Sequence, residues 1–145
     1  MRAAPTSFAA GQTATALSTP SAAVPGNPME PFLCVQMLAL DSTNAYWFNQ
    51  TDNGIYKTPR NGSPYVRLTV LANPPPNIAV DQSAGYLYWS DGTAGTVSRI
   101  PVIGGTTSTV ATGQTHPQAV AVDTTAVYWT NGTGAHAGEL MKLAK

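Results

Sequence analysis

Charged residues, cysteines and long apolar runs are all scarce in this chain of 145 residues. Charged residues make up 10% of it, against roughly 25% in typical soluble domains, and the formal net charge is zero. The seven basic residues are scattered, so no electropositive surface is expected for the phosphates of DNA or RNA, and nucleic-acid binding is excluded. No stretch approaches the about eighteen apolar residues of a membrane-spanning helix, so we expect no membrane span.

The single cysteine, Cys34, excludes an intrachain disulfide framework. The N-terminus lacks the apolar central region of a secretory signal, so no signal peptide is visible. These two absences leave the cellular compartment of the protein open.

Turn-forming residues are abundant by contrast, with 13 glycines and 12 prolines. Threonine, alanine and valine fill much of the rest of the chain. A sequence poor in lysine and glutamate but rich in turn formers and β-branched residues is typical of an all-β protein with many short strands.

Internal similarity is the strongest feature of the sequence. Three apolar segments end in aspartate: Leu38-Ala39-Leu40-Asp41, Ile78-Ala79-Val80-Asp81 and Val120-Ala121-Val122-Asp123. Each is followed by an aromatic pair: Tyr46-Trp47, Tyr88-Trp89 and Tyr128-Trp129. The aspartates are 40 and 42 residues apart, and the chain's three tryptophans all occupy the same repeat position. Chance is a poor explanation for this spacing.

Each complete repeat contains four short apolar or alternating runs separated by Gly-containing turns, which predicts a four-stranded antiparallel sheet. A period of about 40 to 45 residues with four strands is typical of a β-propeller blade. We therefore predict an all-β partial propeller of about three blades, at residues 32–72, 73–112 and 113–145. The third blade is expected to be incomplete, because the chain stops after its third strand.

The N-terminal residues 1–31 are rich in alanine, serine, threonine and proline, and we expect them to be largely disordered. One segment in them, Phe8-Ala9-Ala10-Gly11-Gln12, echoes Val110-Ala111-Thr112-Gly113-Gln114. We interpret this similarity as an isolated outer strand near residues 3–10. Such a strand would belong to a preceding blade and be followed by an insertion.

The tetrapeptides that contain the aromatic pairs resemble the YWTD repeats of low-density-lipoprotein-receptor-type (class B) six-bladed propellers. Those tetrapeptides are Tyr128-Trp129-Thr130-Asn131, Tyr88-Trp89-Ser90-Asp91 and, departing at both later places, Tyr46-Trp47-Phe48-Asn49. The whole unit is even more similar to uncharacterised bacterial propeller-repeat proteins. The resemblance covers roughly residues 35–145 and implies an extracellular or periplasmic protein. It indicates a fold and not one function, because this fold hosts receptors, lyases, lactonases and scaffolds.

The repeated residues are interpreted as structural. An aspartate at the end of the first strand can accept hydrogen bonds from the backbone of the next turn, as expected for Asp41, Asp81 and Asp123. One ring of each Tyr-Trp pair should face the packing between blades. A sugar-stacking aromatic surface is the alternative interpretation of these pairs.

Four other side chains are candidate ligands for a cation or a polar substrate: Asp52, Asp91, His116 and His136. Both aspartates lie in the same turn of consecutive repeats, where turn chemistry is the competing explanation. The histidines lie in different loops, and neither has a partner at metal-ligand spacing. No catalytic motif, cofactor-binding motif or zinc spacing is present, so no cofactor or metal is assigned.

Two functions remain open on the sequence. The favoured one is a non-enzymatic binding module for a protein or a small polar ligand. The alternative is a fragment of a propeller enzyme, of a lyase or lactone-hydrolase type, with a site on the face of the central channel. Three blades cannot close a ring, so the chain is either a fragment or pairs with a second copy to complete a six-bladed ring.

Overall fold

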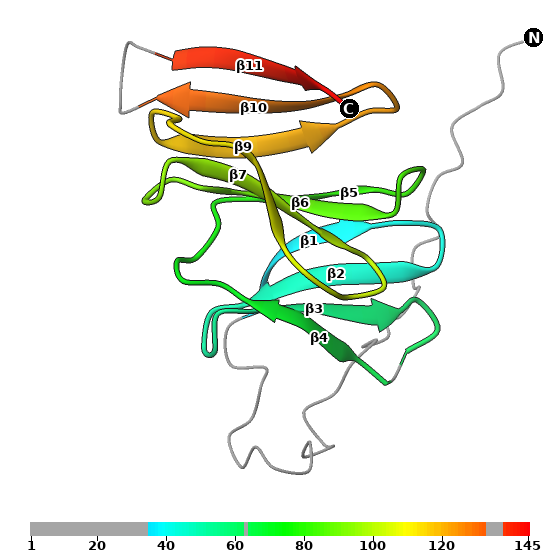
Figure 1. The fold of residues 1–145 in the computed structure, drawn as a ribbon. Coiled ribbons are helices and arrows are strands. Elements are labelled where there is room, and N and C mark those ends of the chain that lie inside the picture. Colours follow the sequence, from blue (N-terminus) through cyan, green and yellow to red (C-terminus); the bar gives the residue numbers. More distant parts are fainter. Residues whose placement is uncertain (1–34, 63, 133–137) are drawn as a thin grey trace, which may run out of the picture.

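The computed structural model describes residues 35–62, 64–132 and 138–145, and among these residues it contains strands but no helix. The strands form three antiparallel sheets, which we call blades 1 to 3 in chain order (Figure 1). Blade 1 contains β1 (Val35–Leu40), β2 (Asn44–Asn49), β3 (Gly54–Pro59) and β4 (Val66–Val70). Blade 2 contains β5 (Ile78–Asp81), β6 (Tyr86–Asp91), β7 (Thr96–Pro101) and β8 (Ser108–Ala111). Blade 3 contains β9 (Pro117–Val122), β10 (Ala126–Gly132) and β11 (Gly138–Ala144).

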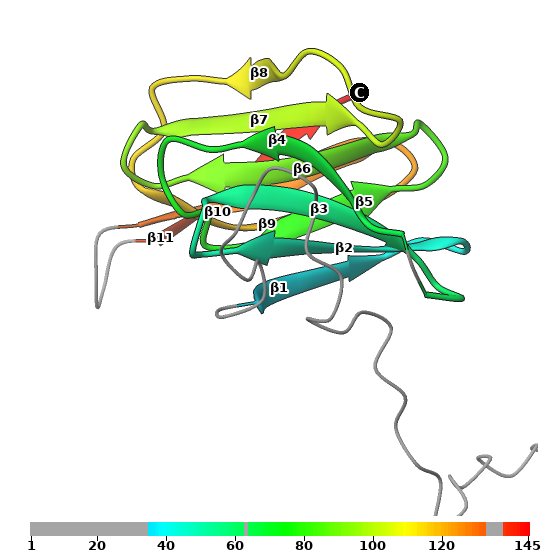
Figure 2. The same ribbon diagram turned by 90° about the horizontal axis from the view of Figure 1, so that it is seen from below.

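Each blade is a simple meander, because every strand pairs with the next one along the chain. The blades lie face against face in chain order, as Figures 1 and 2 show from two directions. The first strands of the blades, β1, β5 and β9, contact one another in turn and therefore form the inner side of the stack. The predicted all-β partial propeller, with a third blade that is one strand shorter in the described residues, is confirmed.

The three tryptophans occupy equivalent places in the sheets. Trp47 pairs with Leu38, Trp89 with Ile78 and Trp129 with Val120, each between the first two strands of its blade. The exposed fractions of the three residues are 5%, 5% and 4%. Because neighbouring residues of a strand point to opposite faces, each blade has a Trp face and a Tyr face, named after its Tyr-Trp pair.

Two apolar seams hold the blades together. Between blades 1 and 2, the Tyr face of blade 1 meets the Trp face of blade 2, through Tyr46, Phe48, Ile55, Ile78, Leu87, Trp89 and Ile100. Between blades 2 and 3, the same two kinds of face meet through Tyr88, Val97, Val120, Val127 and Trp129. Full burial of one such side chain is worth about 1.5–3 kcal/mol, so each seam supplies a large part of the stability of the stack.

The expected disorder of residues 1–31 and the stray strand near residues 3–10 lie outside the described residues. Within the described part of the chain, no helix is long and apolar enough to cross a membrane.

Candidate functional site

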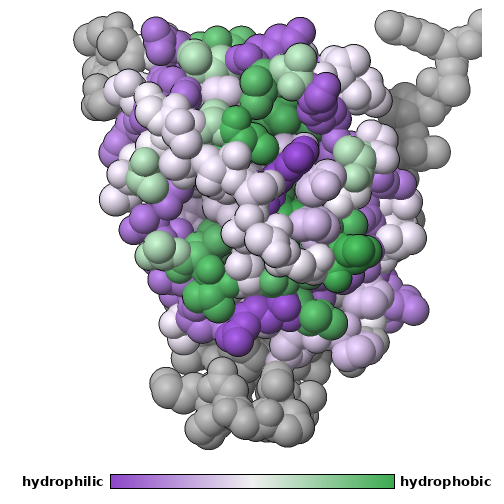
Figure 3. All heavy atoms as spheres, viewed as in Figure 1, coloured by the Kyte–Doolittle hydropathy of each residue, from purple (hydrophilic) through white to green (hydrophobic). Residues whose placement is uncertain are grey.

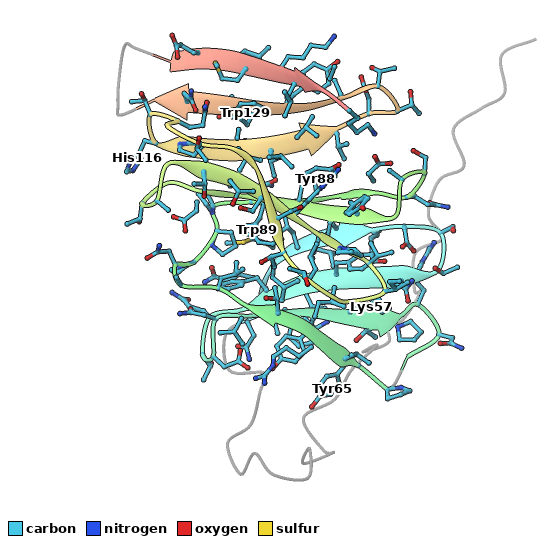
Figure 4. All side chains as sticks on the ribbon, viewed as in Figure 1. Lys57, Tyr65, Tyr88, Trp89, His116 and Trp129 are labelled. Carbon is cyan, nitrogen blue, oxygen red and sulfur yellow. The ribbon has the colours of Figure 1, made fainter. Side chains whose placement is uncertain are left out.

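The stack has two ends that carry different loops. The connection end holds the blade-to-blade connections 71–77 and 112–116 together with the turns 50–53 and 92–95. The hairpin end holds the turns 41–43, 82–85, 102–107 and 123–125. Backbone hydrogen bonds anchor the connections to the turns beside them, from Leu71 N to Asn53 O (2.8 Å) and from Gln114 N to Gly95 O (2.9 Å). The candidates Asp52, Asp91 and His116 all lie at the connection end, where Figure 4 labels His116.

The carboxylate of Asp52 is engaged within its own blade. One oxygen accepts a hydrogen bond from the backbone N–H of Gly54 (3.0 Å), and the other accepts one from the Tyr56 hydroxyl (2.5 Å). Arg67 Nη1 lies 3.5 Å from the second oxygen. Burial and the hydrogen bond to Asp52 raise the pKa of Tyr56 to about 12, so this hydroxyl keeps its proton and remains a donor.

Asp91 is engaged in a similar way, by a different set of donors. Its Oδ1 accepts hydrogen bonds from the backbone N–H groups of Thr93 (3.0 Å) and Ala94 (2.8 Å). Its Oδ2 accepts one from the side-chain amide of Asn73 (3.0 Å) in the preceding connection. The turns of Asp52 and Asp91 are equivalent, but the carboxylates come from different positions: Asp91 is two residues after its tryptophan and Asp52 is five residues after its own.

His116 is exposed, and its backbone has a positive φ of 52°. Its ring lies against Gly92, where a β-carbon would come within 3.7 Å of the ring carbon Cδ2. His136 lies outside the described residues. In the described part of the chain, no three His, Cys, Asp or Glu side chains come together as a metal-binding group.

The repeated aspartates lie at the hairpin end and hold the turns that follow the first strands. Asp41 Oδ1 accepts hydrogen bonds from the backbone N–H groups of Thr43 (2.7 Å) and Asn44 (2.6 Å), and its Oδ2 accepts one from the Tyr46 hydroxyl (2.6 Å). Partial burial opposes ionisation, but the hydrogen bonds from Tyr46 and the turn outweigh it and lower the pKa of Asp41 to about 2. Asp123 has the equivalent bonds to its turn and to Tyr128 (3.0 Å).

Asp81 differs in what binds its second oxygen. Its turn also donates two backbone hydrogen bonds, from Ser83 and Ala84 (both 3.0 Å). The next hairpin is longer here, so the tyrosine of blade 2's Tyr-Trp pair is not a partner, and the ammonium group of Lys145 in blade 3 donates instead. Burial opposes ionisation, but Lys145 and the turn lower the pKa of Asp81. This ion pair therefore links blades 2 and 3.

A basic residue lies across the strand pair from each tyrosine of the Tyr-Trp pairs. Lys57 donates a hydrogen bond to the backbone carbonyl of Val102 in blade 2 (2.8 Å), so it too links two blades. The Arg99 guanidinium carbon lies 4.2 Å from the centre of the Tyr86 ring, and Lys142 Nζ lies 5.5 Å from that of Tyr128. The last two are cation–π contacts.

Sequence reasoning missed a pair of carboxamides in the blade-to-blade connections. Gln114 Oε1 accepts hydrogen bonds from Trp129 Nε1 (2.9 Å) and from Asn131 Nδ2 (3.1 Å). Asn73 makes the equivalent contact with Asp91, which occupies the position of Asn131 in its blade. We call this contact the carboxamide clamp. In it, a side-chain carboxamide of a blade-to-blade connection binds the residue two positions after the tryptophan of the following blade. A carboxamide 17 or 18 residues before that position was the available signal.

No protein-family model and no curated protein matches the chain. Solved structures do match it, among them two that contain β-propellers. One is the crystal structure of a nidogen/laminin complex, with a TM-score of 0.60 and 19% identity, covering 67% of this chain and 39% of that one. The other is virginiamycin B lyase from Staphylococcus aureus, with a TM-score of 0.53 and 15% identity, covering 74% of this chain and 40% of that one.

The chain thus spans about two fifths of the length of each solved chain, 39% and 40%. One of these structures is a complex between proteins and the other is an enzyme, so the likeness does not choose between the two functions. What the stacked sheets and both likenesses establish is the fold: this chain is a β-propeller array with YWTD-like repeats.

Proposed function

We propose that this array is a non-enzymatic binding module that presents its connection end to a protein partner. The observation that carries the proposal is that the carboxylates at this end are already hydrogen-bonded within the protein. Asp52 and Asp91 already accept hydrogen bonds from their own turns and neighbours. A carboxylate that acts as a general base or binds a metal needs a lone pair directed at its substrate or ion, and here each carboxylate oxygen already accepts at least one hydrogen bond from the protein.

Several exposed side chains of the connection end are neutral and can form hydrogen bonds. They are Gln50, Thr51, Thr93 and Thr115. Hydroxyl and carboxamide groups on loops are typical of surfaces that bind other proteins. Figure 3 shows hydrophilic and hydrophobic residues interspersed over the face in view. Such a surface favours a partner that is itself largely neutral and polar.

The loops of this end are fixed before any partner binds. The connections are held by the backbone bonds of Leu71 and Gln114 and by the carboxamide clamps. Loops that are already ordered lose little conformational entropy on binding, which increases the affinity that a given contact area provides. An extracellular or periplasmic location, which the repeat resemblance implies, belongs to this proposal.

A peptide-display selection on the immobilised chain tests the proposal. Peptides enriched on the chain should lose about tenfold or more in affinity on the variants Thr93→Lys and Thr115→Lys, which place a large charged side chain at the connection end. The matched control is Thr106→Lys, at an exposed residue of the hairpin end, which should bind as the unchanged chain does. Equal binding to all three variants would place the interaction elsewhere and contradict the proposal.

The enzyme alternative is tested on the same preparation, with virginiamycin B as a probe substrate and added divalent cations. The binding proposal predicts no consumption of the antibiotic. Consumption that depends on a cation and is abolished by His116→Ala would contradict the binding proposal and support the lyase alternative.

A further inference from the structure

The third strand of blade 3 is exposed where its counterparts in the other blades are covered. β3 and β7 each pair with a fourth strand, and no residue of either strand is exposed. Among the residues that the structure describes, β11 pairs only with β10, and every residue of β11 except Met141 is exposed. The outer edge of β11 therefore presents a row of backbone N–H and C=O groups to which an extended segment can add.

Leu140 shows most clearly what this edge lacks. It lies opposite the residue that follows the tryptophan of its blade, as Ile55 and Val97 do in blades 1 and 2. Ile55 and Val97 are fully buried, whereas Leu140 is 77% exposed. The fourth strands help to bury the first two, because Leu68 of β4 and Val110 of β8 pack in the same seams.

The two fourth strands meet the third strand with the same irregularity. Each contains one residue without a partner in the register, Leu68 in β4 and Val110 in β8. A bulge of this kind redirects a side chain, and in both blades it places an apolar side chain in the seam. A strand that adds to β11 in the same register would therefore place its bulged residue beside Leu140.

The basic residue of β11 sets a second requirement. Lys142 occupies the position of Arg99, which pairs with Ser108 of β8. The Arg99 Nε donates a hydrogen bond to Ser108 Oγ (3.4 Å). Lys142 is exposed, and its ammonium group lies over the ring of Tyr128. A hydroxyl or carboxylate on a strand opposite Lys142 can accept a hydrogen bond from it in the same way.

We propose that the outer edge of β11 binds an extended, largely neutral segment of a partner protein as the fourth strand of blade 3. The segment runs antiparallel to β11 and carries a hydrogen-bond acceptor opposite Lys142. Two residues later it carries an apolar bulged residue, and the next residue, opposite Leu140, is small or β-branched. The internal example of this pattern is Ser108-Thr109-Val110-Ala111 in β8.

This interface continues one that the other blades already contain. Backbone hydrogen bonds to the strand edge supply the affinity, and the side chains beside Leu140 and Lys142 supply the specificity. The edge of β11 is separate from the loops of the connection end, so this inference does not depend on the function proposed for those loops.

A synthetic peptide with the sequence of residues 106–112, which contains β8, tests the proposal. Added at millimolar concentration to the full chain, it should change the amide NMR signals of β11 saturably and slow the exchange of these amides. Val110→Asp in the peptide should weaken binding about tenfold, because a charge would then lie beside Leu140. The matched control is Thr106→Asp, which lies outside the paired residues of β8 and should bind as the unchanged peptide does.

Two variants of the chain locate the site. Leu140→Lys should weaken binding of the unchanged peptide about tenfold, whereas Ile103→Lys, at a residue 87% exposed in the β7–β8 hairpin, should not. Thr93→Lys, at the connection end, should also leave binding of this peptide unchanged, which separates this test from that of the proposed function.

Two results would overturn the proposal. One is a peptide that leaves the β11 signals unchanged or binds the Leu140→Lys and Ile103→Lys variants equally. The other is protection of the β11 amides that rises with the concentration of the chain alone, because a second copy would then occupy the edge.

Discussion

At the scale of single residues, one carboxylate per blade organises the first hairpin. Asp41 accepts hydrogen bonds from two backbone N–H groups and from the side chains of Thr43 and Tyr46. Such a set of donors favours the ionised form, which is why the pKa of Asp41 falls to about 2 although partial burial works against it. The pKa values of Asp81 and Asp123 are lowered as well. The three aspartates therefore make the stack sensitive to acid in the same direction.

The pH dependence of stability follows from this direction. A carboxylate whose pKa is lower in the folded state stabilises that state above its unfolded pKa, near 4, and loses this contribution as the pH falls toward about 2. Asp41→Asn should reduce the free energy of unfolding at pH 7 by about 1–2 kcal/mol and flatten its dependence on pH between 4 and 2. Urea unfolding at both pH values measures this. Glu139→Gln, at an exposed carboxylate, should leave the curve unchanged, and an unchanged curve for Asp41→Asn would contradict the account.

At the scale of the strands, blade 2 differs from its neighbours in one hairpin. The interval from the repeated aspartate to the tyrosine of the Tyr-Trp pair is five residues in blades 1 and 3 and seven in blade 2. The pairing is nevertheless conserved, because Tyr46 lies opposite Ala39 and Tyr88 opposite Ala79. The two added residues lengthen the turn, which contains Gly85 at a φ of 72°. Tyr88 is therefore too far along its strand to bind Asp81.

This difference predicts unequal effects of two matched substitutions. Tyr46 and Tyr88 are both fully buried, but only Tyr46 donates to a carboxylate within normal hydrogen-bond distance (2.6 Å). The Tyr88 hydroxyl has Arg99 Nη1 at 3.5 Å. Tyr46→Phe should lower the free energy of unfolding by about 1–2 kcal/mol, and Tyr88→Phe by about 0.5 kcal/mol or less. Urea titrations of the two variants compare them, and equal losses would show that the Asp-Tyr bond is not a stabilising contact.

Much of the fold, and less of the candidate site, was predictable from the sequence. Periodic spacing located the blades and the tryptophans, because each blade must repeat the same packing to stack on the next. The spacing also indicates the longer hairpin of blade 2, because seven residues in place of five separate its repeated aspartate from its tyrosine. The contact of Lys145 with Asp81 was not predictable, since it joins residues 64 positions apart whose proximity exists only once blades 2 and 3 are stacked. The carboxamide clamps were missed although their spacing of 17 or 18 residues was an available signal.

At the scale of the whole molecule, polar contacts at the hairpin end reinforce the apolar seams. Ser42 and Gln82 exchange two hydrogen bonds across blades 1 and 2 (3.0 and 2.7 Å). The Lys145 side chain, 14% exposed, contacts the Asp81 carboxylate across blades 2 and 3 and the Asp123 carbonyl within blade 3. Removing one partner of a mostly buried ion pair leaves the other charge without compensation, which costs more than the pair itself contributes.

Lys145→Ala should therefore destabilise the stack by about 2 kcal/mol, because Asp81 would keep its burial and lose its cation. The control is Lys142→Ala, which removes an exposed lysine of β11 three residues before Lys145 and should cost about 0.5 kcal/mol or less. Thermal unfolding of both variants at pH 7 measures the difference. A Lys145→Ala variant as stable as the control would show that the ion pair does not stabilise the contact between blades 2 and 3.

The stacking of equivalent sheets is tested most directly by nuclear Overhauser effects from the tryptophan rings. The structure predicts contacts from Trp89 to the methyl groups of Ile55 in blade 1, and from Trp129 to those of Val97 in blade 2, because these side chains share a seam. Contacts of both indole rings only to residues of their own sheets would contradict the β-propeller arrangement.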